Sequence, residues 1–337
     1  MSNVGQLERK TQNRVVKFFK EQLDYDYLGD WEYREGNSNI ETDLLIKWLK
    51  SRKVSEALIK RTLRKLDAAA ALGEGKKLYD ANKEVYRLLR YGVKEKEGTG
   101  EQNQTVWLID WENPEANNFA IAEEVTVKGE QLSPKRKRPD IVIYVNGIAL
   151  GVIELKRSSV SVSEGIRQNL DNQKKAFIRN FFTTMQITMA GNDTQGIRYG
   201  TIETSEKYYL EWKEPDDSGS LPSADVTTET LLDTHLAQLC DKGRFLQLVH
   251  DYIVFDAGVK KACRHNQFFG IQAAQKHVKS KQDGIIWHTQ GSGKSLTMVW
   301  LAKWIRENVT DSRVLIVTDR TELEKKKKKV FSGVDEE

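Results

Sequence analysis

The stretch "RPDIVIYVNGIALGVIELKR", residues 138–157, has the pattern of a β-hairpin, with two apolar runs joined by Asn-Gly at 146–147. Asn-Gly is the preferred pair for a two-residue hairpin turn. Three charged residues interrupt this apolar pattern: Asp140 stands at its entrance, and Glu154 and Lys156 lie near its end. Residues two apart share one face of a strand, so Glu154 and Lys156 point the same way. They form either a solvated strand end or a chemical site, and the spacing alone fits both interpretations.

The register of this hairpin decides whether Asp140 can join them. A regular ladder continued from a two-residue turn pairs Asp140 with Ile153, which places Asp140 and Glu154 on opposite faces. A shared site therefore requires a one-residue offset, supplied by a bulged turn at Gly147 or a β-bulge at Gly151. We predict such an offset, and a regular hairpin would rule out a site that contains both carboxylates.

If they share a face, Asp140, Glu154 and Lys156 form the PD-(D/E)xK constellation of metal-dependent nucleases. Magnesium prefers a few carboxylates plus water, and it can polarise a phosphate and lower the pKa of a bound water. The Lys156 ammonium can orient that water or stabilise charge on the phosphate. Two more residues are candidate members of this site: Gln168, on the helix expected after the strand, and Glu8, on the first expected helix. Each, taken alone, also fits an ordinary surface residue.

Composition limits the alternatives. The chain has 337 residues, 39% hydrophobic and 30% charged, with a net charge of +4, which is typical of a folded protein of about two domains. Any basic surface must be local, such as "KRKR" at 135–138. Cys240 and Cys263 belong to no metal or disulfide pattern, which fits a reducing cytosol. No signal peptide or membrane-spanning run occurs, so no membrane association is expected.

The order of the expected elements indicates an α/β protein. Helical spacing covers residues 2–23, 39–72 and 78–92, and Gly92 is the predicted cap of the last of these helices. Strand-like segments follow up to residue 155, then a helix, two short strands and a helical stretch that reaches residue 256. This pattern predicts a mixed sheet flanked by helices. After a boundary near 256–262, the order becomes helix, strand, glycine-rich loop, helix, strand, which opens a parallel α/β domain.

The second motif is "GIIWHTQGSGKSLTMVWLAKWI", residues 284–305. We expect a short strand at Ile285–Trp287, a phosphate-binding loop, and a helix whose N-terminus points at the bound anion. Lys294 can neutralise the β and γ phosphates of a nucleotide, and the hydroxyl of Ser295 can hold magnesium. The complete expected loop is Gly291, Ser292, Gly293, Lys294 and Ser295. The alternative is a glycine-rich turn that binds no ligand. It does not account for the strand and the helix that are expected on either side of the loop.

Three further features surround this loop. The usual pattern has Gly where this chain has His288, a departure that helicase-type ATPases tolerate. Residues 312–323, "SRVLIVTDRTEL", are expected to form the next parallel strand. Gln267 precedes a helix, where its amide could contact adenine, although a lone Gln also fits a simple helix-start residue.

Taken together, several segments resemble the restriction (R) subunit of type I restriction–modification enzymes. The similar segments run in order along nearly the whole chain: "VGQLERKTQNRVVKFF" (4–19), "YDANKEVYRLLRYGV" (79–93), "TVWLIDWENPEANNFAIAEEVTV" (105–127), "RPDIVIYVNGIALGVIELK" (138–156), "IWHTQGSGKSLTM" (286–298) and "VTDRTEL" (317–323).

The resemblance implies an N-terminal PD-(D/E)xK endonuclease domain, residues 1–255, followed by the start of a RecA-like superfamily 2 translocase domain, residues 256–337. It implies a cytoplasmic bacterial or archaeal subunit that joins methylation (M) and specificity (S) subunits. Such a subunit moves double-stranded DNA with ATP and cuts it with Mg²⁺. The residues it implies are Asp140, Glu154, Lys156 and the accessory Gln168 for cleavage, and Gln267 and Gly291 to Ser295 for the nucleotide.

The chain departs from the family at three places, one of which is the lysine run "EKKKKKVF" (324–331), where a more varied helix is usual. The family's Gln-x-x-x-Tyr element has Asn172 where Tyr is expected, which puts that accessory role in doubt. No DExH-type acidic motif occurs before Glu337, so we expect an N-terminal fragment that binds ATP without hydrolysing it. Cleavage by this fragment alone is expected to be weak or absent. The alternatives are a DNA-binding or assembly module with an inactive nuclease site, and a nucleotide-binding regulator without cleavage.

Overall fold

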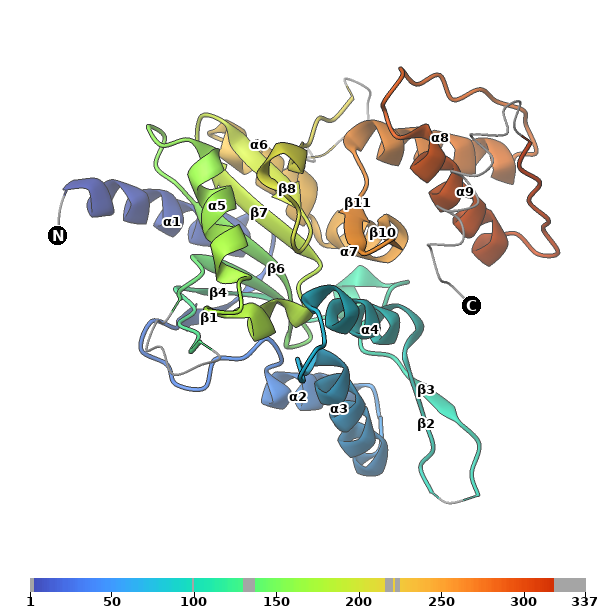
Figure 1. The fold of residues 1–337 in the computed structure, drawn as a ribbon, viewed down its shortest axis with the longest axis horizontal. Coiled ribbons are helices and arrows are strands. Elements are labelled where there is room, and N and C mark those ends of the chain that lie inside the picture. The colour runs from blue at the N-terminus through green and yellow to red at the C-terminus, as the bar shows by residue number, and fades with distance from the viewer. Residues whose placement is uncertain (1–2, 99, 130–136, 216–220, 222–224, 318–337) are drawn as a thin grey trace. The chain divides into compact units, whose positions relative to one another are not determined.

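A computed structural model describes residues 3–98, 100–129, 137–215, 221 and 225–317 of the chain, with side chains from residue 8 onward. The chain divides into two compact units, residues 1–246 (unit 1) and 247–337 (unit 2). Figure 1 shows their helices and strands. The assignment of residues 1–255 to an endonuclease domain and of 256–337 to a RecA-like domain stays a prediction.

Unit 1 is built on a seven-stranded mixed sheet with the strand order β1-β4-β5-β6-β7-β8-β9. The pairs β1–β4 and β6–β7 are parallel, and the other neighbours are antiparallel. The strands are β1 (Asp26–Asp30), β4 (Phe119–Glu123), β5 (Ile141–Val145), β6 (Ile148–Leu155), β7 (Ile187–Asn192), β8 (Gly196–Gly200) and β9 (Leu210–Glu211). This arrangement confirms the mixed sheet expected from the sequence.

Helices cover both faces of this sheet, which is why every residue of the two central strands β5 and β6 is buried. On one face lies α5 (Val162–Asn172), together with the 3₁₀ turn η2 (Arg179–Thr183) and the start of α4 (Leu78–Tyr91). On the other lie α1 (Asn3–Glu21) and α6 (Leu231–Cys240). The α1 residues Val15, Phe18 and Phe19 are buried at helical spacing, as the sequence predicts.

A helical excursion joins β1 to β4. It consists of α2 (Thr42–Ser51), α3 (Glu56–Ala70), α4 and the small hairpin of β2 (Val93–Glu95) and β3 (Gln104–Val106). The side chain of Ser55 caps α3 by accepting a hydrogen bond from the Leu58 amide. Gly92 ends α4 at a φ of 70°, which confirms the predicted cap. Two short 3₁₀ turns complete the unit, η1 (Pro114–Ala116) and η3 (Glu206–Tyr208).

The β5–β6 hairpin contains the predicted one-residue offset. The turn at Asn146–Gly147 has positive φ at both positions, 53° and 84°, and pairs Val145 with Ile148. Between the pairs Tyr144–Ala149 and Ile143–Gly151 the register shifts by one residue, so Leu150 is the extra residue of a β-bulge. The ladder then continues to Ile141–Ile153. The next position along it therefore sets Asp140 opposite Glu154.

Unit 2 contains β10 (Ile253–Asp256) and β11 (Val259–Ala262), which pair as a hairpin, and the helices α8 (His265–Lys279) and α9 (Lys294–Asn308). Helix α7 (Lys242–Asp251) crosses the division between the units. The sequence predicted one helical stretch through residue 256. The structure instead ends α7 at Asp251 and forms a strand from Ile253, because a β-branched apolar run here pairs with β11.

Two predicted strands of unit 2 are wrong for the part of the chain that the structure describes. Residues 285–287 form no strand, and Trp287 is 91% exposed. Residues 312–317 are likewise irregular, with Leu315 87% exposed, and 318–323 lie outside the described residues. A strand needs a partner for its backbone hydrogen bonds and cover for its apolar side chains. Neither segment pairs with another strand among the described residues.

None of the helices within the described ranges combines the length and the apolar character needed to cross a bilayer.

Candidate functional site

The first candidate site lies in unit 1, where the shifted end of the β5–β6 hairpin meets α5 and α1. The amide of Leu155 donates to Oδ2 of Asp140 at 2.6 Å, which ties the entrance of β5 to the end of β6. The ladder sets Glu154 opposite Asp140, whose charge raises the pKa of the Glu154 carboxyl. The register shift thus places both carboxylates on one face, as the nuclease hypothesis requires.

Two amides of α5 hold Glu154, which is fully buried. Nε2 of Gln168 donates to Oε2 of Glu154 at 2.6 Å, and Nδ2 of Asn172 donates to Oε1 at 3.1 Å. Both donors are on α5, one helical turn apart, so they face the same strand. The helix comes this close because Gly165 has no side chain: a Cβ there would lie 3.0 Å from the Cβ of Ala190.

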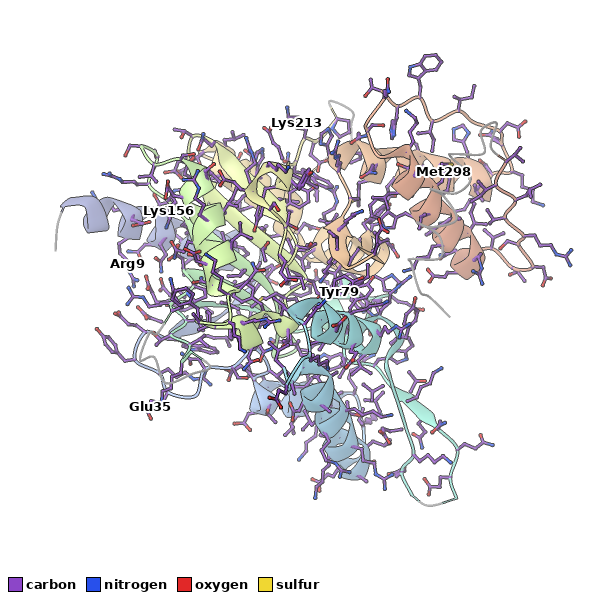
Figure 2. The ribbon with its side chains drawn as sticks, viewed as in Figure 1. Arg9, Glu35, Tyr79, Lys156, Lys213 and Met298 are labelled. Carbon is purple, nitrogen blue, oxygen red and sulfur yellow. The ribbon has the colours of Figure 1, made fainter. Side chains whose placement is uncertain are left out.

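Lys156 is the next member of this group, and it lies two residues after Glu154, on the same face of the extended chain. Its Nζ donates to Oε1 of Glu8 at 3.1 Å and to the carbonyl oxygen of Leu155 at 2.8 Å. Figure 2 shows Lys156 and Arg9 at the same end of unit 1, where α1 approaches the sheet. Glu8, a candidate site residue from the sequence, is therefore an ion-pair partner of the lysine.

Burial and charge shift the pKa values of this group. Burial raises the pKa of Asp140 to about 6, against the lowering effect of Lys156 and of the Leu155 amide. Burial and the neighbouring Asp140 raise the pKa of Glu154 well above its usual range. Burial alone would lower the pKa of Lys156, but Asp140, Glu154 and Glu8 raise it, so the lysine is charged at neutral pH. The site thus holds two carboxylates that repel each other and one cation.

The sequence reasoning did not single out Glu124, which is buried beside the site and raises the pKa of Asp140. Arg9 donates to Oε1 of Glu124 at 3.0 Å, and Arg138 donates to its Oε2 at 2.5 Å. The Glu124 amide also bonds to the Asp140 carbonyl at 3.0 Å. The signal available in the sequence was the Glu-Glu pair at 123–124, directly after an apolar strand.

The donor atoms of this site fit magnesium. The Asp140 and Glu154 carboxylates and the Leu155 carbonyl are hard oxygen ligands on one side of the hairpin. No group of three or more His, Cys, Asp or Glu side chains suited to a metal ion occurs among the residues that the structure describes. Magnesium keeps several waters and is commonly held by one or two protein carboxylates, so two are sufficient.

The second candidate site is the glycine-rich loop of unit 2. Gly291 and Gly293 have positive φ, 80° and 89°, and Gly293 caps α9, which begins at Lys294. The N-terminus of that helix, which favours an anion, therefore opens onto the loop. Nζ of Lys294 donates to the carbonyl oxygens of His288 and Thr289, at 3.1 and 2.9 Å. The lysine is thus folded over the loop in which a phosphate is expected.

The other predicted members of this loop differ in their contacts. The hydroxyl of Ser292 donates to the Thr289 carbonyl at 2.8 Å and so fixes the turn. Ser295, the second residue of α9, makes no side-chain hydrogen bond within the described part of the chain. His288 packs against α8, since a Cβ at Gly270 would lie 3.1 Å from its Nε2. A larger residue is therefore accommodated where the usual pattern has glycine.

Gln267 is brought against this loop by α8. Its Oε1 accepts a hydrogen bond from the Arg264 amide at 2.8 Å, and its Nε2 donates to the Gly293 carbonyl at 2.9 Å. A Cβ at Gly293 would lie 2.4 Å from that Nε2, so only glycine fits. Gln267 is buried and fixes the loop, and its contact with adenine stays a prediction.

Comparison with known proteins places these sites in context. Residues 5–207 match the family model described as type I restriction enzyme R protein N terminus, and residues 266–337 match the model of the SWI2/SNF2 ATPase.

Individual relatives are similar over most of this chain. A putative type I restriction enzyme endonuclease subunit, MjaIXP, from Methanocaldococcus jannaschii is 27% identical, over 74% of this chain and 26% of its own length. The HindI endonuclease subunit from Haemophilus influenzae is 26% identical, over 75% of this chain and 25% of its own. The SsaAORF53P endonuclease subunit from Staphylococcus saprophyticus is 24% identical, over 64% of this chain and 22% of its own. The chain thus spans about a quarter of the length of these relatives.

Proposed function

We propose that this chain, which belongs to the type I restriction enzyme R protein family, carries a Mg²⁺-dependent DNA nuclease site of the PD-(D/E)xK type in unit 1. The observation that carries the proposal is the β-bulge at Leu150, which sets Asp140 opposite Glu154 at the end of the hairpin. The contacts of Lys156, Gln168 and Asn172 with the same group support it. The names of the relatives, endonuclease subunits, agree with this chemistry.

In this proposal each residue has a defined task. Asp140, Glu154 and the Leu155 carbonyl would hold Mg²⁺, which would supply Lewis-acid polarisation of the scissile phosphate and a water of lowered pKa. Gln168 and Asn172 fix the Glu154 carboxylate in one orientation by bonding to both of its oxygens. The charged Lys156 stabilises negative charge that develops on the phosphate or orients the attacking water. Glu8 keeps Lys156 extended toward the site.

The loop of unit 2 is proposed to bind ATP. Lys294 would leave its carbonyl partners for the β and γ phosphates, and Ser295 would hold the accompanying Mg²⁺. The match of residues 266–337 to an ATPase model supports this assignment. As part of the whole R subunit, with methylation and specificity partners, the chain would then serve ATP-driven movement along duplex DNA and its cleavage.

The decisive test is cleavage of a supercoiled plasmid by the whole subunit with its partners, ATP and Mg²⁺. Asp140→Asn should reduce cleavage about 100-fold or more, the scale of losing one group that stabilises the transition state. It should leave ATP hydrolysis unchanged, because the loop lies in the other unit. Asp171→Asn, which alters an exposed carboxylate on α5, is the matched control and should cut like the wild type.

The rival hypothesis is a DNA-binding or assembly module whose nuclease site is inactive. It predicts that Asp140→Asn and the wild type cut equally, or that neither cuts, with assembly intact. Either of those results would overturn the nuclease proposal.

A further inference from the structure

The segment from Lys47 to Lys65, which forms most of α2 and α3, is strongly basic. It contains eight Lys or Arg residues and one acidic residue, Glu56, a net charge of +7 in a chain whose total is +4. The rest of the chain is therefore net negative. The nuclease and nucleotide proposals assign no role to this segment.

Half of these cations have no partner among the residues that the structure describes. Lys47, Lys53, Lys60 and Arg64 are exposed and form no ion pair or side-chain hydrogen bond within the described ranges. The other cations are engaged: Lys50 with Glu56, Arg52 with Asp110, Lys65 with Glu95, and Arg61 with the Lys96 carbonyl. Exposed like charges left without counterions repel one another, and they indicate a surface suited to an external anion.

Two of these four cations, Lys60 and Arg64, lie on α3. Lys60 and Arg64 are four residues apart, about 6 Å along the helix and on one face. Lys53 precedes them, just before the cap of α3. The neighbouring row, Arg61 and Lys65, fixes the β2–β3 hairpin by donating to the Lys96 and Lys94 carbonyls, each at 2.7 Å.

Where helix and hairpin meet, they form a hollow of about 290 Å³. It is lined by Arg61, Arg64, Lys65, Ala68 and Glu95. Arg64 pairs with none of the described residues around this hollow, so its guanidinium is available to a phosphate, which it can bind through two parallel hydrogen bonds.

The described residues of α2 and α3 expose charged rather than large apolar side chains. None of the large hydrophobic side chains exposed in the described structure lies between Thr42 and Ala70. Protein interfaces depend on buried aromatic and aliphatic anchors at their centre, whereas binding to nucleic acid depends on cations that neutralise phosphates. We propose that the α2–α3 face binds the phosphate backbone of double-stranded DNA, the substrate class that follows from the proposed function.

The fold separates this surface from the nuclease site. α2 begins against the hairpin turn, where the Glu41 amide bonds to the Gly147 carbonyl at 2.8 Å. Asp140 and Glu154 lie at the other end of the same hairpin, six residues or about 20 Å away. Figure 1 shows α3 and the β2–β3 hairpin projecting away from α5. DNA held on this face would thus be anchored about six base pairs or more from the point of cleavage.

The test is binding of the chain to a fluorescent duplex of about 30 base pairs, without Mg²⁺, over a series of salt concentrations. The triple variant Lys53→Ala, Lys60→Ala, Arg64→Ala should bind at least about tenfold more weakly at physiological salt. The slope of log K against log salt should fall by about 0.9 for each lost phosphate contact. A charge-preserving variant, Lys53→Arg, Lys60→Arg, Arg64→Lys, should bind like the wild type and shows that the effect is electrostatic.

A matched control removes the same charge elsewhere: Lys175→Ala, Lys207→Ala and Lys213→Ala, all exposed. It should keep most of the wild-type affinity and slope. Equal losses in both triple variants, or no loss in the α3 variant, would overturn the inference. Asp140→Asn should bind DNA as the wild type does, so a failure of the nuclease proposal is distinguishable from a failure of this one.

Discussion

Replacing Asp140 by Asn should stabilise the protein at alkaline pH, because the wild-type site stores charge repulsion and desolvation. The pKa of Asp140 is raised from 3.8 to about 6, first by burial and then by Glu124 and Glu8. The folded state therefore binds a proton more tightly than the unfolded state between these values. Stability from this group is fully present below about pH 4 and is lost as the pH rises toward 6. A difference of two pKa units corresponds to about 3 kcal/mol at most.

Asn keeps the acceptor for the Leu155 amide and removes the charge. We expect Asp140→Asn to raise the free energy of unfolding by about 1–3 kcal/mol at pH 8 and to change it little near pH 4. The measurement is urea unfolding followed by tryptophan fluorescence at both pH values. The exposed control Asp171→Asn should stay within about 0.5 kcal/mol of the wild type. A variant that is neutral or destabilised at pH 8 would refute the reasoning, since it would show that Lys156 fully compensates the buried charge.

Further expectations concern the groups around the two sites. Asn172→Ala should lower cleavage and stability together, by about 1–3 kcal/mol in unfolding free energy, because an oxygen of Glu154 then loses its donor. Gly165→Ala should cost about 1 kcal/mol or more despite its better helix propensity, since the new Cβ would lie 3.0 Å from the Cβ of Ala190 and 3.3 Å from the Glu154 carbonyl oxygen, both in buried strands; thermal melting checks this. Lys294→Ala should weaken binding of a fluorescent ATP analogue at least about tenfold, by loss of a charge-assisted contact. Gln267→Ala should also weaken it, and unchanged affinity in both variants would contradict the assignment of the loop.

The hairpin and the first site could be predicted because local residues of the hairpin determine its turn and limit its register. Asn146–Gly147 fixed the turn, and the positions of Asp140 and Glu154 made an offset necessary if they were to meet. The sequence could not place the bulge at Leu150, because every residue of β6 is buried and its apolar pattern has no alternation to mark a change of phase.

The two wrongly predicted strands of unit 2 have one physical origin. Residues 285–287 and 314–317 have strong strand propensity, but propensity expresses packing on neighbouring strands, and the described part of unit 2 offers none to them. The hydrogen bond from Asn172 to Glu154 could not be predicted for a related reason. It depends on how closely α5 approaches β6. Gly165 permits this approach, and no local pattern in the sequence reveals it.

The bulge at Leu150 also shifts, by one residue, the alternation of side chains between the two faces of β6. Ala149 and Val152 pack into the same core cluster although they are three residues apart, a spacing that an unbroken strand would send to opposite faces. The turn therefore fixes which residues of β6 pair with β5 at the end next to α2. At the other end the register is the one that sets Asp140 opposite Glu154. Removing Leu150 would restore a regular ladder and would still leave Glu154 opposite Asp140. The strand can thus lose one residue at this point without disturbing the alignment at either end.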